Sequence, residues 1–410
     1  MKILILHMRF APDLTGTGPL VADLAVDLAA YGDEVTVVTS MPHYGRQDVP
    51  AEYRGRLLHR SHFQGVDVWR TFVYVPTHPS GFQRSINYLS YTFMSVIAGI
   101  LSGRQDVILC VNPPITVGFS GWVVSMVRSA PMVFNVQDIW PDCLVIIGQL
   151  RNPLLIPIFQ YLEKFIYRVS TRVTVLSEGM EQKLMGKGVR EDKAVVIPNW
   201  ANVDHIRPVP KENDFRETYG LNGRFLVMFA GNLGYNAVLD TVLDAANLLQ
   251  YDARIHFLIV GEGNAKAGLI ERAQALKLTN VQFLPTQPKE VLPEMLGAAD
   301  VSLVTLNQQL GQLNVPSKTY SIMASGRPVL AAVPEDSEIA RLLREGDCGV
   351  WVPPEDPQAL AQAIQELSQQ PELLDRYGAN GRHYVVDHFD RHVLTRRYHQ
   401  LLHQIVSPKR

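Results

Sequence analysis

Short apolar segments alternate with helical segments along nearly the whole chain, and this alternation most constrains the fold. Residues 3–6 are apolar, a glycine-bearing loop follows, residues 20–30 have helical periodicity, and residues 35–39 form the next apolar run. A strand, a loop, a helix and a second strand in so short a stretch make a βαβ unit with two parallel, buried strands. The chain is therefore expected to belong to the α/β class.

The same alternation begins again in the second half of the chain. Apolar runs at residues 225–230, 255–260, 281–284 and 301–304 are separated by glycine loops and helical segments. Residues 200–215 are rich in Pro, Asp and Asn, as is typical of a linker. We therefore predict two Rossmann-like domains that face each other across a cleft lined by their ligand-binding loops.

The predicted boundaries follow from the linker and from the helical, His- and Arg-rich tail. The first domain is expected over residues 1–203 and the second over residues 204–385. Residues 386–410 are expected to form a C-terminal helix that packs back on the first domain.

The segment 314–328 predicts an anion site. Pro316 suits a first helical turn, Gly326 suits a left-handed helix end, and Pro328 prevents the helix from resuming. Ser317 and Lys318 would stand at the amino terminus of this helix. Because the helix dipole disfavours cations there, the lysine indicates a bound anion; the alternative is a surface lysine at an ordinary helix start.

Composition excludes several classes of protein. A net charge of −2 argues against nucleic acid as the main partner. Cys110, Cys143 and Cys348 are far apart, without metal-ligand spacing, which favours a reducing cytosol. The apolar run at the start is too short for a signal peptide, and no run of about 20 apolar residues predicts a membrane-spanning helix.

Two aromatic, apolar helices are expected at residues 82–101 and 154–169. Each could lie with one face on a membrane, a reading that the basic segment 43–70 supports. The alternative, slightly favoured for residues 82–101, is a helix that covers the sheet.

The loops after predicted strands supply further candidates. Asp138 and Asp142 follow the apolar run at 132–136, where a parallel sheet binds its ligands. Their alternative role, favoured for Asp142, is to cap the following helix. Gly16 and Gly18 lack the third glycine of a dinucleotide fingerprint, so a nicotinamide cofactor is not expected.

Several segments together resemble a known family, the retaining sugar-nucleotide glycosyltransferases of family 4, which have the GT-B architecture. The resemblance spans essentially the whole chain. Segments 138–141 and 316–320 resemble the branch related to N-acetylfucosamine (WbuB-like) transferases, which assembles bacterial O-antigen, capsule and exopolysaccharide. The resemblance to the family rests on residues 10–16, 227–234, 259–263, 278–285 and 324–329.

The resemblance implies that residues 1–203 bind the acceptor and residues 204–385 bind the donor, a nucleotide diphosphate sugar with uridine as the expected base. Asp138 and Lys318 are the implied catalytic residues. The implied donor-binding residues are Gly16, Thr17, Gly18, Gly231, Asn232, Gly234, Gly261, Gly263, Leu284, Pro285, Pro316, Ser317, Lys318, Thr319, Tyr320 and Ser321.

The chain also departs from the family pattern. Leu313 and Ser321 occupy the positions of two frequent glutamates, the second of which holds the ribose. Asn232 and Ala237 replace a frequent Arg and Lys, and Gln137 replaces a frequent active-site histidine.

The expected reaction is transfer of a sugar, with retention, to a sugar or polyprenyl-diphosphate-linked acceptor in cell-surface polysaccharide synthesis. Lys318 would stabilise the leaving diphosphate, and Asp138 would assist the acceptor hydroxyl. Neither a cofactor nor a metal is expected, since no Asp-x-Asp pair is present. The expected location is the cytoplasm, at the inner face of the cell membrane. The alternatives are a sugar-nucleotide 2-epimerase and a non-catalytic partner subunit.

Overall fold

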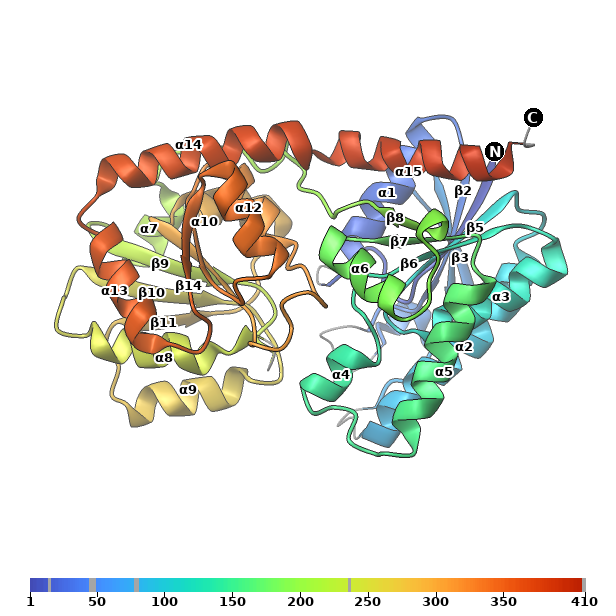
Figure 1. Cartoon of the computed structure of the whole chain (residues 1–410), viewed down its shortest axis with the longest axis horizontal. Helices are drawn as coiled ribbons and strands as arrows, with labels where there is room; N and C mark the ends of the chain where they lie inside the picture. The colour runs from blue at the N-terminus through green and yellow to red at the C-terminus, as the bar shows by residue number, and fades with distance from the viewer. Residues whose placement is uncertain (14–15, 44–48, 77–80, 235–236, 408–410) are drawn as a thin grey trace. The chain divides into compact units, whose positions relative to one another are not determined.

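The computed structural model describes residues 1–13, 16–43, 49–76, 81–234 and 237–407 (Figure 1). Residues 14–15 of the predicted glycine loop and 44–48 of the predicted basic segment lie outside these ranges. The chain divides into two compact units: unit 1 comprises Met1–Asn199 and His392–Arg410, and unit 2 comprises Trp200–Arg391.

Unit 1 is built on an eight-stranded sheet of order β3-β4-β2-β1-β5-β6-β7-β8. All neighbouring strands are parallel except β3, which forms an antiparallel hairpin with β4. The strand order reverses between β1 and β5, which makes their carboxyl ends the expected ligand edge. The strands are β1 Lys2–Leu6, β2 Glu34–Ser40, β3 Leu58–Phe63, β4 Val66–Thr71, β5 Val107–Val111, β6 Met132–Asn135, β7 Arg172–Val175 and β8 Ala194–Val196.

The helices of unit 1 include the two predicted apolar ones. Helices α2, α3 and α5 pack side by side on one face of the sheet (Figure 1). None of the described helices is long and apolar enough to cross a membrane. The helices are α1 Gly18–Ala30, η1 Ala51–Tyr53, α2 Gly81–Leu101, α3 Thr116–Arg128, α4 Asp142–Ile146, α5 Leu155–Val169, α6 Glu178–Gly186, η2 Glu191–Lys193 and α15 Arg391–Val406.

The last helix, α15, is held to unit 1 by buried polar contacts. The Thr395 hydroxyl donates to Asp27 Oδ2 at 2.9 Å, and Asn135 Nδ2 donates to the Tyr398 hydroxyl at 2.8 Å. Because these groups are buried, each bond also avoids leaving an unpaired polar atom in the core.

Unit 2 is a six-stranded parallel sheet of order β11-β10-β9-β12-β13-β14. This is the 3-2-1-4-5-6 order of a Rossmann fold, with the reversal between β9 and β12. Both units are thus parallel-sheet α/β domains, which confirms the predicted fold class. The strands are β9 Phe225–Ala230, β10 Ile255–Val260, β11 Val281–Leu284, β12 Val301–Thr305, β13 Val329–Ala332 and β14 Gly349–Val352.

Helices cover both faces of this second sheet. Helices α8, α9 and α13 lie on one side, and α12 and α14 lie on the other (Figure 1). Helix α14 also contacts α11. The helices are α7 Asp214–Thr218, α8 Leu239–Leu248, α9 Lys266–Ala275, η4 Lys289–Val291, α10 Leu292–Gly297, α11 Lys318–Ala324, α12 Glu338–Gly346, α13 Pro357–Leu367 and α14 Pro371–His388.

Strand β14 is absent from the sequence-based assignment. It has four residues and begins with Gly349, so no hydrophobic periodicity marks it. A Cβ on Gly349 would lie 1.9 Å from the carbonyl oxygen of Val329. The glycine thus serves the close approach of β14 to β13, a contact that emerges only in the folded sheet.

Candidate functional site

Lys318 and Gly231 meet at the strand-order reversal of unit 2. The Lys318 ammonium lies 3.3 Å from the centroid of the Phe229 ring, near the carboxyl end of β9. A Cβ on Gly231 would lie 3.7 Å from Lys318 Cδ and 3.9 Å from Nζ. The lysine side chain therefore lies against Gly231, which brings two of the predicted donor-binding segments together.

Within the described residues, no hydrogen bond or ion pair compensates the charge of Lys318. Its side chain is half-buried, and loss of hydration lowers its pKa well below the ordinary value of lysine. The cation–π contact with Phe229 contributes on the order of 1 kcal/mol, less than the cost of burying an unpaired ammonium. An anion bound beside Gly231 would supply the missing partner.

Gly261 and Gly263 lie where two loops of unit 2 touch. A Cβ on Gly261 would lie 1.9 Å from the Gly231 carbonyl oxygen, and a Cβ on Gly263 would lie 2.4 Å from that of Leu233. The Gly261 amide also donates to the Leu284 carbonyl oxygen at 3.1 Å. The close contact between the loops is enough to require glycine at both positions. Their role in nucleotide binding therefore stays a prediction.

The side chains of Thr319 and Tyr320 point into the core of unit 2. Tyr320 stacks on Phe389 with ring centroids 4.6 Å apart. Both hydroxyls are buried without a hydrogen-bond partner among the described residues. The Thr319 amide donates to the Pro316 carbonyl oxygen at 3.1 Å and the Tyr320 amide to that of Ser317 at 3.2 Å. The amides of these two implied donor-binding residues thus already have acceptors within the first helical turn.

The remaining predicted residues of unit 2 differ in exposure. Asn232 and Pro285 are exposed, Gly234 and Leu284 are buried, and Ser321 is half-buried. The exposed side chains are open to a ligand, whereas the buried ones shape the loops.

Lys266 is a basic residue that the sequence reasoning missed. Its ammonium donates to the Gly261 carbonyl oxygen at 3.0 Å and to Glu262 Oε1 at 2.6 Å. Lys266 is the first residue of α9 and follows the predicted Gly261–Gly263 loop after two residues. Its position at a helix start after a glycine loop could have identified it from the sequence. Unit 2 therefore has a second cation at the edge where Lys318 lies.

In unit 1, Thr17 is held by a buried histidine. The Thr17 hydroxyl lies 2.7 Å from His7 Nε2, and His7 Nδ1 lies 2.8 Å from the Val111 carbonyl oxygen. Because a carbonyl oxygen can only accept, Nδ1 carries the proton. Burial lowers the pKa of His7 from 6.5 to about 3, so the ring is neutral and Nε2 accepts from Thr17. His7 was not among the predicted residues.

The neutral state of His7 predicts a pH dependence of stability. Below pH 6.5 the unfolded chain binds a proton at His7, whereas the folded chain does so only near pH 3. The unfolded state thus binds more protons in this window, and the free energy of unfolding falls as the pH falls. His7→Asn should remove up to about 1.4 kcal/mol per pH unit of this slope, as measured by urea unfolding between pH 6.5 and 4. His383→Asn, at an exposed position, is the control; an unchanged slope in His7→Asn would contradict the assignment.

Asp138 follows β6, the strand next to β5, and so lies on the same ligand edge of the unit 1 sheet. Asn112, directly after β5, donates from Nδ2 to the Asp138 carbonyl oxygen at 2.8 Å and accepts from the Gln137 amide at 2.6 Å. The hydrogen bonds that start from Thr17 and from Asp138 thus end on adjacent residues, Val111 and Asn112. The Asp138 side chain is half-buried.

Gln137, in place of the family's histidine, takes part in a buried amide network. Its Nε2 donates to Asn135 Oδ1 at 2.7 Å, and its Oε1 accepts from Asn199 Nδ2 at 2.8 Å. The Gln137 side chain therefore has a structural role at the carboxyl end of β6.

The predicted capping role of Asp142 is wrong. Pro141 precedes α4, and no side chain caps this helix. Asp142 is instead the first residue of α4 and pairs with Lys187 at 2.9 Å. Lys187 also contacts the buried Glu163 at 2.8 Å, so it links α4, α5 and α6.

Arg9 is a second cation that was not predicted. Gly16 has a φ of +67°, and a Cβ there would lie 2.7 Å from Arg9 Nη1. A Cβ on Gly18 would lie 3.5 Å from Arg9 Cβ. The arginine thus lies against the glycine loop of unit 1, which holds three of the implied donor-binding residues.

Known proteins share both domains. Residues 15–200 match the family described as glycosyl transferase 4-like domain, and residues 211–384 match glycosyl transferases group 1. An Escherichia coli (strain K12) protein named as the colanic acid biosynthesis glycosyl transferase WcaI is 27% identical over 407 residues, which cover 97% of this chain and 98% of that protein. A Pseudomonas aeruginosa protein named as the glycosyltransferase WbjE is 30% identical over 276 residues, 66% of each chain.

Solved structures agree in fold. The crystal structure of Anabaena HepE in complex with UDP has a TM-score of 0.74 and 17% identity, and the match covers 98% of this chain and 100% of that one. HepE has also been solved with UDP-glucose. The two domain matches, the relatives and the fold lead to one assignment. The chain belongs to the GT-B glycosyltransferases that combine a 4-like amino-terminal domain with a group 1 carboxyl-terminal domain.

Proposed function

We propose that the protein transfers a sugar from a UDP-sugar to a sugar or polyprenyl-diphosphate-linked acceptor in bacterial surface polysaccharide synthesis, with retention of configuration. The observation that carries the proposal is the Lys318 ammonium beside Gly231, which has no counter-charge among the described residues. The names of WcaI and WbjE and the UDP complexes of HepE support it. Within this family, the chain is proposed to belong to the branch related to N-acetylfucosamine (WbuB-like) transferases.

Lys318 is proposed to act on the leaving group. When the bond between the anomeric carbon and the diphosphate oxygen breaks, negative charge grows on that oxygen. A half-dehydrated ammonium stabilises this charge more than an ammonium in water does. The acceptor oxygen forms the new bond to the anomeric carbon and loses its proton, for which Asp138 is the proposed acceptor.

Binding of nucleotide sugars to the full chain tests the donor. UDP-sugars should raise the melting temperature and bind in calorimetry, because a ligand that binds only the folded state stabilises it. The matching ADP- and GDP-sugars are the comparison. Equal binding of all three would overturn the uridine assignment, and no binding of any would overturn the transferase proposal.

The acceptor is proposed to be reached at a membrane surface. Apolar side chains on the α2–α5 face of unit 1 are 58–76% exposed: Phe82, Leu89, Phe93, Leu154, Ile158 and Tyr161. A groove of about 670 Å³ runs between α2, α3 and α5 on this face, lined by apolar side chains that include Val96, Phe119, Val123 and Leu162. Such a continuous apolar face favours contact with lipid.

Substitutions on this face should weaken membrane binding. Leu89→Asp and Phe93→Asp should each lower binding to anionic phospholipid vesicles by at least about tenfold, since each side chain contributes about 1.5–3 kcal/mol when buried. Sedimentation with vesicles measures the effect. Tyr251→Asp, at a side chain 71% exposed in unit 2, is the matched control. Equal sedimentation of all variants would contradict the membrane proposal.

Two alternatives are separated by simple assays. A 2-epimerase would convert a nucleotide sugar in the absence of an acceptor, whereas a transferase needs the acceptor. A non-catalytic partner would bind the nucleotide sugar without transferring it. Transfer is proposed to need no metal cofactor, so activity should persist in a chelator.

A further inference from the structure

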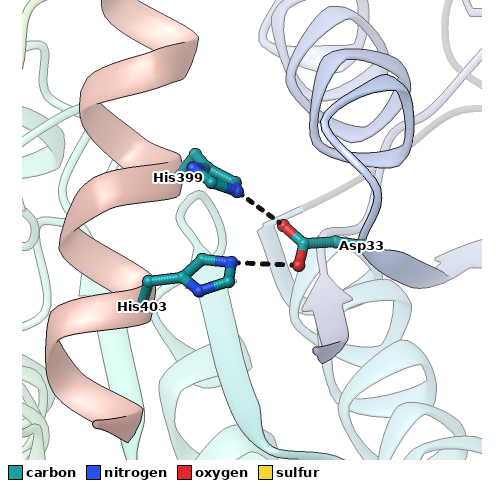
Figure 2. A group of neighbouring side chains, drawn as sticks. All are labelled: Asp33, His399 and His403. Atoms are coloured by element: carbon teal, nitrogen blue, oxygen red, sulfur yellow. Dashed lines mark hydrogen bonds and ion pairs between the residues drawn. The ribbon is translucent and has the colours of Figure 1, made fainter.

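Three potential metal ligands meet at the amino-terminal edge of the unit 1 sheet. Asp33 lies in the turn before β2, and His399 and His403 project toward it from α15 (Figure 2). Asp33 Oδ2 lies 3.4 Å from His399 Nε2, and Asp33 Oδ1 lies 3.1 Å from His403 Nε2. One ligand atom from each of the three residues lies within 4.8 Å of the others.

The two histidines come from one helix, and the carboxylate comes from a turn. His399 and His403 are four residues apart, so they share one face of α15 and their ring centroids are 4.2 Å apart. The Asp33 side chain is 2% exposed, whereas His399 and His403 are 25% and 42% exposed. The cluster therefore has a buried carboxylate at its base and two imidazole rings that reach solvent.

Within the described residues, the Asp33 carboxylate has hydrogen bonds at only one of its two oxygens. Asp33 Oδ1 also contacts the amino group of Met1 at 2.9 Å, but Oδ2 is buried without a hydrogen bond among the described residues. Burial lowers the pKa of His399; His403, Arg396 and the Met1 amino group act in the same direction, and Asp33 opposes them. A neutral imidazole is the form that binds a metal.

We propose that Asp33, His399 and His403 bind a Zn²⁺ ion. Two imidazoles and one carboxylate are a donor set that zinc takes, with water in the fourth position. Tetrahedral bonds of about 2.0–2.2 Å place neighbouring donor atoms roughly 3.3–3.6 Å apart. The 3.1 and 3.4 Å separations of the histidines from Asp33 are close to this spacing, and the more exposed His403 ring can move to complete it. The ion would fasten α15 to the turn between α1 and β2.

Calorimetry with ZnCl₂ on the full, chelator-treated chain tests the site. One Zn²⁺ should bind per chain and raise the melting temperature. His399→Ala and His403→Ala should each weaken binding by at least about tenfold, the lower end of the typical loss for residues that only support a ligand. Both side chains reach solvent, so these variants are expected to fold.

The control removes a histidine from a similar pair. His383 lies 3.2 Å from Asp387 on α14, also at a spacing of four, but no third ligand joins them in the part of the chain that the structure describes. His383→Ala should bind Zn²⁺ like the wild type. An affinity that is unchanged in His399→Ala and His403→Ala, or is lost equally in His383→Ala, would overturn the proposal. Absence of Zn²⁺ binding to the wild type would also overturn the proposal. The cluster would then be a metal-free pairing of Asp33 with the two histidines.

Discussion

Replacing Lys318 with alanine is expected to lower kcat/KM for sugar transfer by about 10²–10³-fold, the usual cost of removing one preorganised group that stabilises charge on a reacting oxygen. The expectation rests on the position of the ammonium, 3.3 Å from the Phe229 ring and without a counter-charge among the described residues. Steady-state kinetics with the UDP-sugar that binds measure the loss. Lys289→Ala, an exposed lysine of unit 2, removes the same charge and should leave the rate unchanged.

A second measurement separates a role of Lys318 in anion binding from a loss of structure. In the free protein, loss of hydration lowers the pKa of Lys318, and a bound diphosphate would raise it again. UDP binding should therefore take up protons at alkaline pH, where the diphosphate is fully ionised. Calorimetry in buffers of different ionisation enthalpy measures this uptake. Equal uptake in the wild type and in Lys318→Ala would contradict the assignment.

Gly261→Ala is expected to lower the free energy of unfolding by about 3 kcal/mol or more, because overpacking and backbone strain each cost about 1–3 kcal/mol. Gly261 has a φ of +149°, and its added Cβ would lie 1.9 Å from the Gly231 carbonyl oxygen. Hydrogen bonds hold both backbones in place, from the Gly231 amide to the Val260 carbonyl oxygen and from the Gly261 amide to the Leu284 carbonyl oxygen. Urea unfolding followed by circular dichroism measures the change.

The control for this substitution is another glycine of the same domain. Gly268 lies inside α9, and a Cβ there would meet nothing within 4 Å. Gly268→Ala should therefore be neutral or stabilising, by up to about 1 kcal/mol from helix propensity. A similar free energy of unfolding for both variants would show that close approach of the loops does not require glycine at position 261.

Much of the fold was predictable because parallel strands in an α/β protein are buried on both faces. Their apolar runs, such as residues 225–230 and 255–260, need no knowledge of their neighbours to be recognised. Strand β14 lacked this signal, since its pairing depends on the close approach of Gly349 to Val329. The order of the strands follows from how the helices pack, which periodicity does not encode.

The candidate site was predictable in part. Lys318 could be singled out because a cation at a helix start is unusual, and Asp138 because it follows a buried strand. His7 could not, since its neighbours in the sequence do not reveal that its ring lies between Thr17 and Val111. Asp142 was misassigned because its partner, Lys187, is distant in sequence.

The sequence by itself determined the α/β class, the two Rossmann-like domains and the segment with Lys318, because periodicity, glycine placement and helix-end chemistry are local properties. The tertiary structure decided what the polar residues around that segment do. It paired Gln137 with Asn135 and Asn199, and it placed Asp33 between two histidines of the last helix. The physical reason is that the charge state and partners of a polar group depend on what burial brings next to it, often from far along the chain. Folding also places the Lys318 ammonium against an aromatic ring, with no counter-ion among the described residues. The residues of the helix start do not reveal this environment.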